Sequence, residues 1–532
     1  MAEASASSVL EAKFSRGPSR VGMLVFGVVL IAGLVFIGTS IARDLGNVEL
    51  GSAWPYILLG TALLVALGFE FVNGFHDTAN AVATVIYTHS LDPNIAVVWS
   101  GFWNFFGVVT SSGAVAFAIV SLLPVELILQ VGSSAGFAMV FALLVAAILW
   151  NLGTWSFGLP ASSSHTLIGS IIGVGIANQL MSARSGTSGV DWAQAANIAK
   201  SLVLSPIFGF LLASLLFLFM KAVIKDKRLY EAPVGNAPPP FWIRGLLIFT
   251  CTGVSFFHGS NDGQKGMGLI MLVLIGTVPT TYALNHAVTP RQSADFVAVS
   301  HQAADTLDKY VIPAAVVGDP RDDVTDYIRT KEFKPGTMLA LRVLVNDIGT
   351  EMAQFKELAA VPREHVRNFR NDMYLVSEAL RLMQRSGKQQ FAAADVVVLK
   401  NYKGHIDKAT RFIPLWVKVA VALALGLGTM VGWKRIVVTV GEKIGKDHLT
   451  YAQGAAAEIT AMATIGAADG LGLPVSTTHV LSSGVAGTMM ANHSGLQMST
   501  VRNLLLAWVL TLPAAMTLSG CLFYAFRQLF RG

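Results

Sequence analysis

The chain of 532 residues is too apolar for a water-soluble protein of that length. Hydrophobic residues make up 53% and charged residues 13%, and the mean hydropathy is +0.58. That charged content is about half the usual share, so the composition indicates a polytopic membrane protein and excludes a disordered, collagen-like or disulfide-stapled secreted chain. The net charge of +6 requires only basic loops beside a membrane, and we predict no nucleic-acid partner.

The N-terminal region is predicted to be a polar tail, residues 1–20, followed by an extra transmembrane helix at 21–42. The apolar run carries no charge and is long enough to span a bilayer, which makes a cleaved signal peptide the weaker alternative. We expect an all-α membrane protein with about 10–13 membrane segments. The further apolar segments are 54–73, 80–88, 94–120, 136–157, 165–181, 201–220, 243–257, 266–285, 412–433, 450–468, 475–491 and 503–526.

Two pairs of motifs indicate that the chain repeats itself. GFHD at 74–77 matches GSND at 259–262, and GLPASSSHT at 158–166 matches GLPVSTTHV at 472–480. Each half is therefore predicted to contain a helix broken near its Asp. A second segment follows, in which the Pro ends one helix and hydroxyl residues begin the next.

The halves are expected to be 54–224 and 241–528, the second interrupted by an insertion. Lys and Arg gather in the loops 221–244 and 434–449, which should therefore be cytoplasmic, with 225–240 as the linker between the halves. The counterpart of 434–449 in the first half, 121–135, has no Lys or Arg and should be external. Equivalent loops on opposite sides predict an inverted repeat with broken or re-entrant helices, an architecture typical of transporters.

The insertion at 286–410 divides the second half into 241–285 and 411–528. It holds roughly half of the charged residues of the chain, with a net charge near zero. Apolar side chains recur at helical spacing at 366, 369, 373, 376, 380 and 383. We predict a small soluble helical bundle, on a side of the membrane that the charges leave open.

Two acidic residues, Asp77 and Asp262, are predicted to lie inside apolar helices. A lone carboxylate in hydrocarbon is costly, so each should face a cavity, a cation or a proton; capping of a broken helix is the structural alternative. Asn80 lies three residues after Asp77, and a carboxylate with an amide oxygen suits a hard cation such as sodium. Lys265 occupies the matching position of the second half, so a twofold-related sodium site should be damaged there.

Other polar residues of these segments are candidates for a proton relay or for charge pairing. His76 and His258 flank the two Asp residues, and each either titrates near physiological pH or only donates a hydrogen bond. Glu70 and Glu458 are further intramembrane carboxylates, outside the matched motifs, that either line the pathway or carry protons.

The two hydroxyl runs are candidate oxyanion sites. A helix N-terminus offers unpaired N–H groups and a positive dipole end, and Ser and Thr hydroxyls add donors at the same place. Two such ends facing each other in the membrane would form a cage for a tetrahedral oxyanion. Simple helix capping is the alternative for one such run, and the presence of two matched runs favours binding.

Together these segments resemble the inorganic phosphate transporter (PiT) family, and the chain after about residue 54 is similar to its bacterial low-affinity Pit-type permeases. The motifs that carry the resemblance are 74–81, 258–266 and the two Gly-Leu-Pro segments. The resemblance implies an inverted-repeat transporter, often a homodimer, that imports inorganic phosphate across the bacterial inner membrane. In sodium-coupled members an Asn-Asp-x-Ala-Asn pattern occurs in both halves. Here His76 and Lys265 replace one Asn each, as in the proton-coupled branch that takes neutral metal–phosphate complexes.

The resemblance also implies residue roles. Phosphate would be held by the hydroxyl residues Ser162, Ser163, Ser164, Thr166, Ser476, Thr477 and Thr478. The coupling proton, or a divalent ion such as magnesium travelling with phosphate, would be held by Asp77, Asn80, Asn261 and Asp262, with Asp77 and Asp262 as metal ligands. Membrane lipid surrounds such a protein, and no tightly bound cofactor is expected.

Several alternatives stay open. Sodium coupling would replace the proton if a complete site survived beside Lys265. A sulfate or other oxyanion permease is a second reading, although Asp77 and Asp262 favour an anion that carries a proton, as hydrogen phosphate does. A passive anion channel is a third. An intramembrane serine hydrolase is disfavoured because adjacent Ser164 and His165 point apart on one helix and the motif is duplicated; we therefore expect no enzyme.

Overall fold

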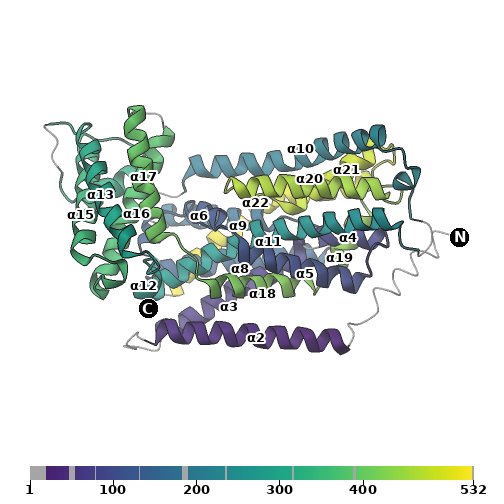
Figure 1. Ribbon diagram of the computed structural model, residues 1–532, viewed down its shortest axis with the longest axis horizontal. Coiled ribbons are helices and arrows are strands. Elements are labelled where there is room, and N and C mark those ends of the chain that lie inside the picture. The colour runs from purple at the N-terminus through teal and green to yellow at the C-terminus, as the bar shows by residue number, and fades with distance from the viewer. Residues whose placement is uncertain are drawn as a thin grey trace.

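The computed structural model describes residues 20–46, 54–77, 79–130, 132–181, 190–233, 237–313, 317–386 and 391–529. The polar tail predicted at 1–20 lies almost wholly outside them. Long helices run side by side along one axis, and a helical bundle stands across one end of this body (Figure 1). Within the described ranges the fold is helical, and the single β-bridge joins Gly445 to Leu496.

The first half follows an N-terminal helix, α2, in the order expected. Its helices are α2 (Arg20–Leu45), α3 (Trp54–Asp77), α4 (Ala79–Tyr87), α5 (Pro93–Thr110), α6 (Ala114–Val120), α7 (Val125–Leu129), α8 (Ser134–Ser156), α9 (Ser163–Met181) and α10 (Trp192–Val223), with the 3-10 turn η1 (Lys227–Tyr230) after them. The second half consists of α11 (Phe241–Thr277), α12 (Pro279–Tyr282), α18 (Leu415–Thr429), α19 (Lys434–Glu442), α20 (Tyr451–Gly470), α21 (Thr477–Ala491) and α22 (Met498–Leu529).

The protein is a multi-pass membrane protein. Six of the described helices are long and apolar enough to cross a bilayer, and the number rises to eight if each of two sharply bent helix pairs is one span. The bent pairs are α5 with α6, at 74°, and the bundle helix α17 (Ala393–Thr410) with α18, at 73°. The helices that follow the two Gly-Leu-Pro segments, α9 and α21, are not among the six. The 10–13 segments expected from sequence include these shorter or more polar helices.

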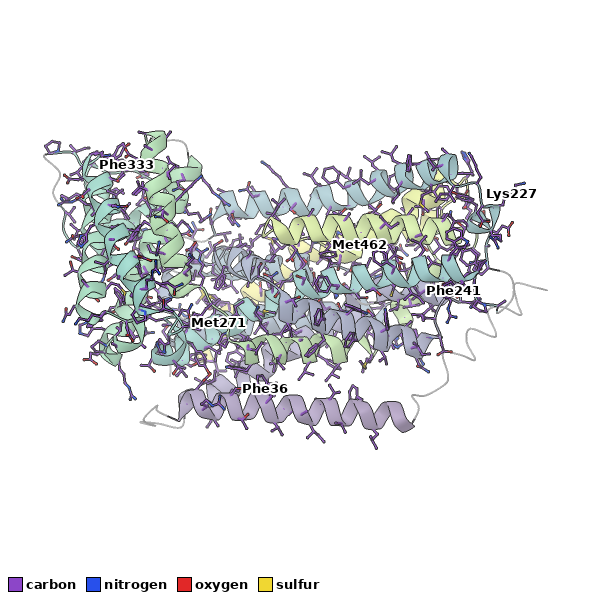
Figure 2. The ribbon with its side chains drawn as sticks, in the orientation of Figure 1. Phe36, Lys227, Phe241, Met271, Phe333 and Met462 are labelled. Atoms are coloured by element: carbon purple, nitrogen blue, oxygen red, sulfur yellow. The ribbon has the colours of Figure 1, made fainter. Side chains whose placement is uncertain are left out.

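The basic loops lie at one end of the molecule and the bundle at the other. Lys227 marks the end away from the bundle (Figure 2). Nearby, η1 packs against α20, which directly follows the second basic loop, 434–449. The counterpart loop of the first half lies at the bundle end, where α7 contacts bundle helix α14 (Pro320–Thr330). Equivalent loops thus occupy opposite ends, the arrangement that an inverted repeat requires.

α3 ends at Asp77 and α4 begins at Ala79, with residue 78 outside the described residues, whereas α11 passes through Asp262 without a break. The prediction of a broken helix in the second half is therefore wrong. Lys265 lies one turn after Asp262 on the same helix and its ammonium pairs with that carboxylate, so the charge is neutralised while the helical hydrogen bonds stay intact. Glycines along α11 also admit close neighbours that would otherwise force the helix aside.

The two Gly-Leu-Pro segments form matching bent tips between helices. The preceding helices end at Ser156 and Gly470, four residues before each Pro, rather than at the Pro itself. Gly158 and Gly472 then turn the chain, with φ of +65° and +66°, a conformation that a side chain disfavours. From Pro160 and Pro474 onward both tips are buried, and they lead directly into the N-termini of α9 and α21.

In its described residues the insertion forms a bundle of five α-helices around an apolar core. Its helices are α13 (Pro290–Asp308), α14 (Pro320–Thr330), α15 (Thr337–Phe355), α16 (Arg363–Ser386) and α17 (Ala393–Thr410). The bundle is anchored to the membrane helices by Arg381, which donates to Asp191 at the start of α10 over 2.7 Å. Arg385 donates to Gln194 of the same helix. The core of the bundle is continuous with that of the first half.

Glycines allow α5 and α11 to cross in backbone contact, which brings the site residues of α11 against α5. A Cβ on Gly259 would lie 2.2 Å from the carbonyl oxygen of Asn104. We expect Gly259→Ala to lower the stability of the purified protein by about 1–3 kcal/mol, because two helices must move apart. Gly245→Ala is the matched control on α11, with nothing within 4 Å of its Cβ. The measurement is thermal unfolding in detergent. Equal melting temperatures of the two variants would contradict the prediction.

Candidate functional site

Asp77, the last residue of α3, accepts hydrogen bonds from both hydroxyl tips. Ser163, at the start of α9, donates to its Oδ2 over 2.6 Å. Thr478, in the first turn of α21, donates to its Oδ1. His76 Nδ1 lies 3.4 Å from the same Oδ1, and its Nε2 lies 3.2 Å from Thr154 Oγ1. The end of α3 thus presents the Asp77 carboxylate to the N-termini of two other helices, one from each half.

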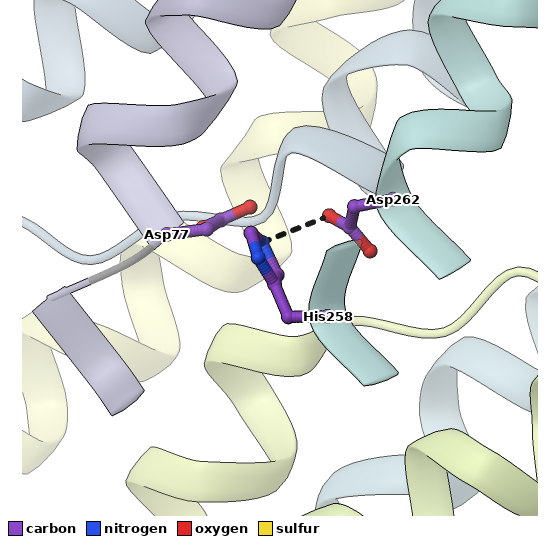
Figure 3. A group of neighbouring side chains, drawn as sticks. All are labelled: Asp77, His258 and Asp262. Carbon is purple, nitrogen blue, oxygen red and sulfur yellow. Dashed lines mark ion pairs between the residues drawn. The ribbon is translucent and has the colours of Figure 1, made fainter. Parts of the chain in front are cut away.

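Asp262 faces Asp77 from α11, on the other side of the His258 ring (Figure 3). The Lys265 ammonium lies 2.6 Å from Asp262 Oδ2, and both side chains are buried. His258 Nε2 lies 3.6 Å from the same oxygen, while its Nδ1 lies 2.7 Å from Asn104 Oδ1. Ser163 Oγ also approaches Asp262, at 3.4 Å, so this one hydroxyl lies between the two carboxylates.

The ligand atoms of Asp77, His258 and Asp262 all lie within 4.8 Å of one another. Two carboxylates and an imidazole at this spacing form a group that fits a divalent cation. The Lys265 ammonium already neutralises one of the carboxylates, so a cation here would share Asp262 with it. The two carboxylates that the sequence analysis selected are thus brought together, as expected for a joint site.

The hydroxyl tips meet each other, but their side chains divide into two kinds. Ser162 and Ser476 cap their helices by accepting from the backbone N–H of His165 and His479, over 3.2 and 3.1 Å. For these two residues capping, the structural alternative, describes the observed contacts.

Two further hydroxyls of the predicted set bond to atoms of the protein scaffold. Ser164 donates to the carbonyl oxygen of Val475 over 2.7 Å, which ties the two tips together. Thr166 donates to Asn151 Oδ1 over 2.9 Å. Thr477 Oγ1 is buried and has no hydrogen-bond partner among the described residues. The hydroxyls that face the carboxylates are therefore Ser163 and Thr478, and Thr477 is free to bind a ligand.

The remaining predicted residues lie at varying distances from this centre. Asn261 holds the second tip by donating to the carbonyl oxygen of Leu473 over 3.1 Å. The side chain of Asn80 lies outside the described residues. Glu70 is buried about two turns before Asp77 on α3, where its side chain would collide with a Cβ on Gly266 of α11. Glu458 accepts from Thr250, three turns before Asp262 on α11, and is not part of the cluster.

Several residues of the site were not selected from sequence. Asn104 and Asn151 are lone amides inside long apolar segments, a signal that could have identified them as buried polar contacts. His165 and His479 recur at the same place in both motifs, and their rings lie 4.5 Å apart behind the tips. Asp469 lies in the last turn of the Ala-rich helix α20 and accepts from Ser260 over 2.6 Å, a contact that no local pattern predicts.

The site combines hydroxyl donors at two helix N-termini with two carboxylates, one ammonium and two imidazoles. Helix N-termini stabilise anions through free N–H groups and the helix dipole. The carboxylates accept protons or cations, so an anion and a cation can be bound side by side without net burial of charge.

The sequence model of the phosphate transporter family matches residues 73–519. The chain belongs to this family. The resemblance that the motifs predicted is thereby confirmed. The match contains both motif pairs as well as the insertion, and α2 precedes it.

Relatives are similar over nearly their whole length. The low-affinity inorganic phosphate transporter PitB of Escherichia coli (strain K12) is 43% identical over 491 residues, which cover 89% of this chain and 97% of PitB. PitA of the same strain is 44% identical, with 88% and 96% covered. A probable low-affinity inorganic phosphate transporter of Bacillus subtilis (strain 168) is 29% identical, with 89% and 99% covered. A solved structure of a sodium-dependent phosphate transporter, 19% identical, aligns with a TM-score of 0.49 over 89% of this chain and 100% of that one.

Proposed function

We propose that this protein is a secondary active transporter that imports inorganic phosphate across a bacterial inner membrane. The observation that carries the proposal is the meeting of two helix N-termini, α9 and α21, at the carboxylate of Asp77. Membership of the phosphate transporter family and the names of its relatives support the same substrate. The relatives are named as transporters, which supports a role in transport rather than catalysis.

Phosphate is the oxyanion that suits a site with both donors and carboxylates. Ser163, Thr477 and Thr478 with the N–H groups of their helices would donate to its oxygens. Hydrogen phosphate also carries a proton that it can donate to a carboxylate such as Asp77, whereas fully ionised sulfate has none. Sulfate should therefore bind less well at this site.

Coupling to protons follows from the ammonium of Lys265. In the second half this ammonium pairs with the Asp262 carboxylate. A sodium ion would need that carboxylate, and an amide oxygen in place of the ammonium. A proton on Asp77, Asp262 or a neighbouring His is then the simplest coupling ion. The group formed by Asp77, His258 and Asp262 would take the metal of a neutral complex of phosphate with magnesium or another divalent cation. Sodium coupling is the second candidate, because Asn80 follows Asp77 at a spacing that would add an amide oxygen to the carboxylate for a hard cation.

The experiment that tests these proposals is labelled-phosphate uptake into proteoliposomes that contain this protein alone. A proton gradient or a sodium gradient is imposed, each with and without magnesium, and excess sulfate is added as a competitor. We expect accumulation that the proton gradient drives, magnesium increases and sulfate leaves largely unchanged.

Other outcomes separate the alternatives. Accumulation driven only by sodium would contradict the argument from Lys265 while leaving phosphate as substrate. Equilibration without accumulation under any gradient would indicate a channel. Strong competition by sulfate would indicate a general oxyanion permease.

A further inference from the structure

A second cluster of cationic side chains lies where the bundle meets the membrane helices, outside the site described above. It surrounds a cavity of about 40 Å³ between α6, α11, α16 and the end of α17. A single water needs ~10–15 Å³ of such space, so the cavity has room for a small polyatomic ion. Met271, which lines it on α11, lies at the junction of the bundle and the membrane body (Figure 2).

Arg370 of α16 is the unusual residue of this cavity. Its side chain is only 7% exposed, and none of the ion pairs among the described residues includes it. Its Nε is buried without a hydrogen-bond partner, and its Nη1 reaches only the side-chain oxygen of the adjacent Asn371, at 3.3 Å. A buried charge is normally paired, because removal of an ion from water is costly. The described residues give this guanidinium one aromatic face, the Tyr374 ring at 5.2 Å, and no anionic partner, so its position suits a counter-anion.

The other charged residues of this cavity are paired with residues other than Arg370. Arg411 lies over the Phe117 ring at 5.7 Å, and its Nε lies 3.2 Å from Asp407 Oδ1. Burial, and in lesser measure the charge of Arg411, lower the pKa of Arg370 to about 10, so its guanidinium is still charged near neutral pH. Glu378 is the one acidic residue of the lining, and it is already paired with Arg381.

We propose that this cavity is a second anion site, in which Arg370 binds a phosphate group at the bundle end of the membrane helices. Guanidinium groups bind phosphate oxygens through paired N–H donors. The phosphate group could belong to free inorganic phosphate or to a lipid headgroup, since the chemistry at Arg370 is the same. The choice of phosphate over other anions rests on the proposed function.

The position of the cavity relates it to the central site. Leu272, which lines it, lies seven residues beyond Lys265 on the continuous helix α11, a separation of about 10 Å along the axis. Phosphate bound at Arg370 would therefore be held about two turns of α11 from Lys265, before it enters the central site or after it leaves.

Equilibrium dialysis of labelled inorganic phosphate tests the proposal on the full-length protein in phosphatidylcholine nanodiscs. We expect the wild type to bind two phosphates per chain and Arg370→Gln to bind one. Arg342→Gln is the matched control, because it removes a guanidinium that pairs with exposed Asp308 on the bundle; this variant should bind two. Arg370→Lys keeps the charge without the paired donors, and should weaken the second site about tenfold while leaving the bundle folded.

A lipid arm identifies the source of the phosphate group. Phosphatidylglycerol is added to the nanodiscs, and lipid that stays bound is measured by native mass spectrometry. A headgroup occupies the site if phosphatidylglycerol displaces the second phosphate from the wild type and stays bound to it. Arg370→Gln should then retain no phosphatidylglycerol. If Arg370→Gln binds as much phosphate and as much phosphatidylglycerol as the wild type, the proposal is wrong.

Failure of the proposed function would be visible separately. Asp262→Asn should remove only the phosphate bound at the central site and leave the phosphate bound at Arg370. If phosphate is not the transported ion, Asp262→Asn will not change phosphate binding and the wild type will show no uptake. Neither result depends on Arg370.

Discussion

Replacing Asp262 with Asn is expected to abolish phosphate uptake, by on the order of a hundredfold or more, while the protein still inserts in the membrane. The change leaves the fully buried Lys265 ammonium without its carboxylate at 2.6 Å. Breaking a buried ion pair by removing one partner costs ~3–5 kcal/mol, and the lost carboxylate is also the one that faces Asp77 across His258. Uptake into proteoliposomes under a proton gradient measures the effect.

Two controls separate transport from stability. Asp308→Asn makes the same chemical change at an exposed ion pair of the bundle, and should transport as the wild type does. Asp262→Asn combined with Lys265→Met removes both charges and should recover the thermal stability lost in the single variant, but not uptake. Equal uptake by Asp262→Asn and Asp308→Asn would exclude Asp262 from the mechanism.

Replacing Lys265 with Asn is expected to change the coupling ion. Without the ammonium, Asp262 and Asp77 are two buried carboxylates whose oxygens lie within 4.8 Å of His258 and of each other, an arrangement that requires another cation. An amide oxygen at 265 would complete a set of oxygen ligands that suits a hard cation. We expect proton-driven uptake to fall at least tenfold, as estimated from the loss of one buried charge partner, and a sodium gradient to stimulate what remains.

The matched control is Lys400→Asn, which removes an ammonium from an exposed position on bundle helix α17. It should leave both the rate and the ion dependence of uptake unchanged. If Lys265→Asn also retains proton-driven uptake, and a sodium gradient does not increase its uptake, then Lys265 does not decide the coupling ion. The proposal of proton coupling then loses its main support.

Much of the architecture could be predicted from sequence because the signals are local or repeated. Low charge and long apolar runs are direct consequences of burial in lipid. The hydroxyl tips were found because Gly-Leu-Pro is followed by Ser or Thr at the same spacing twice. Asp77 and Asp262 stood out because a carboxylate in an apolar helix is costly enough to require a function.

The assignment of individual roles depended on contacts between distant segments. Thr478 reaches Asp77 across 401 positions of the chain and Ser163 across 86. By contrast, Ser162 and Ser476 bond within their own helix turns and act as caps. All four hydroxyls look alike in sequence, because residue type does not specify whether a donor meets its own backbone or a partner from the other half.

Four features followed from the sequence alone, because each depends on composition or on spacing along the chain. They are the membrane class, the repeated halves, the separate bundle and the two facing sets of polar residues. Only the tertiary structure decided that α11 runs unbroken, that the Lys265 ammonium pairs with Asp262, and that Arg370 is buried with no acidic partner among the described residues. These three features depend on which groups surround a charge in space, and the cost or gain of a buried charge is set by those neighbours.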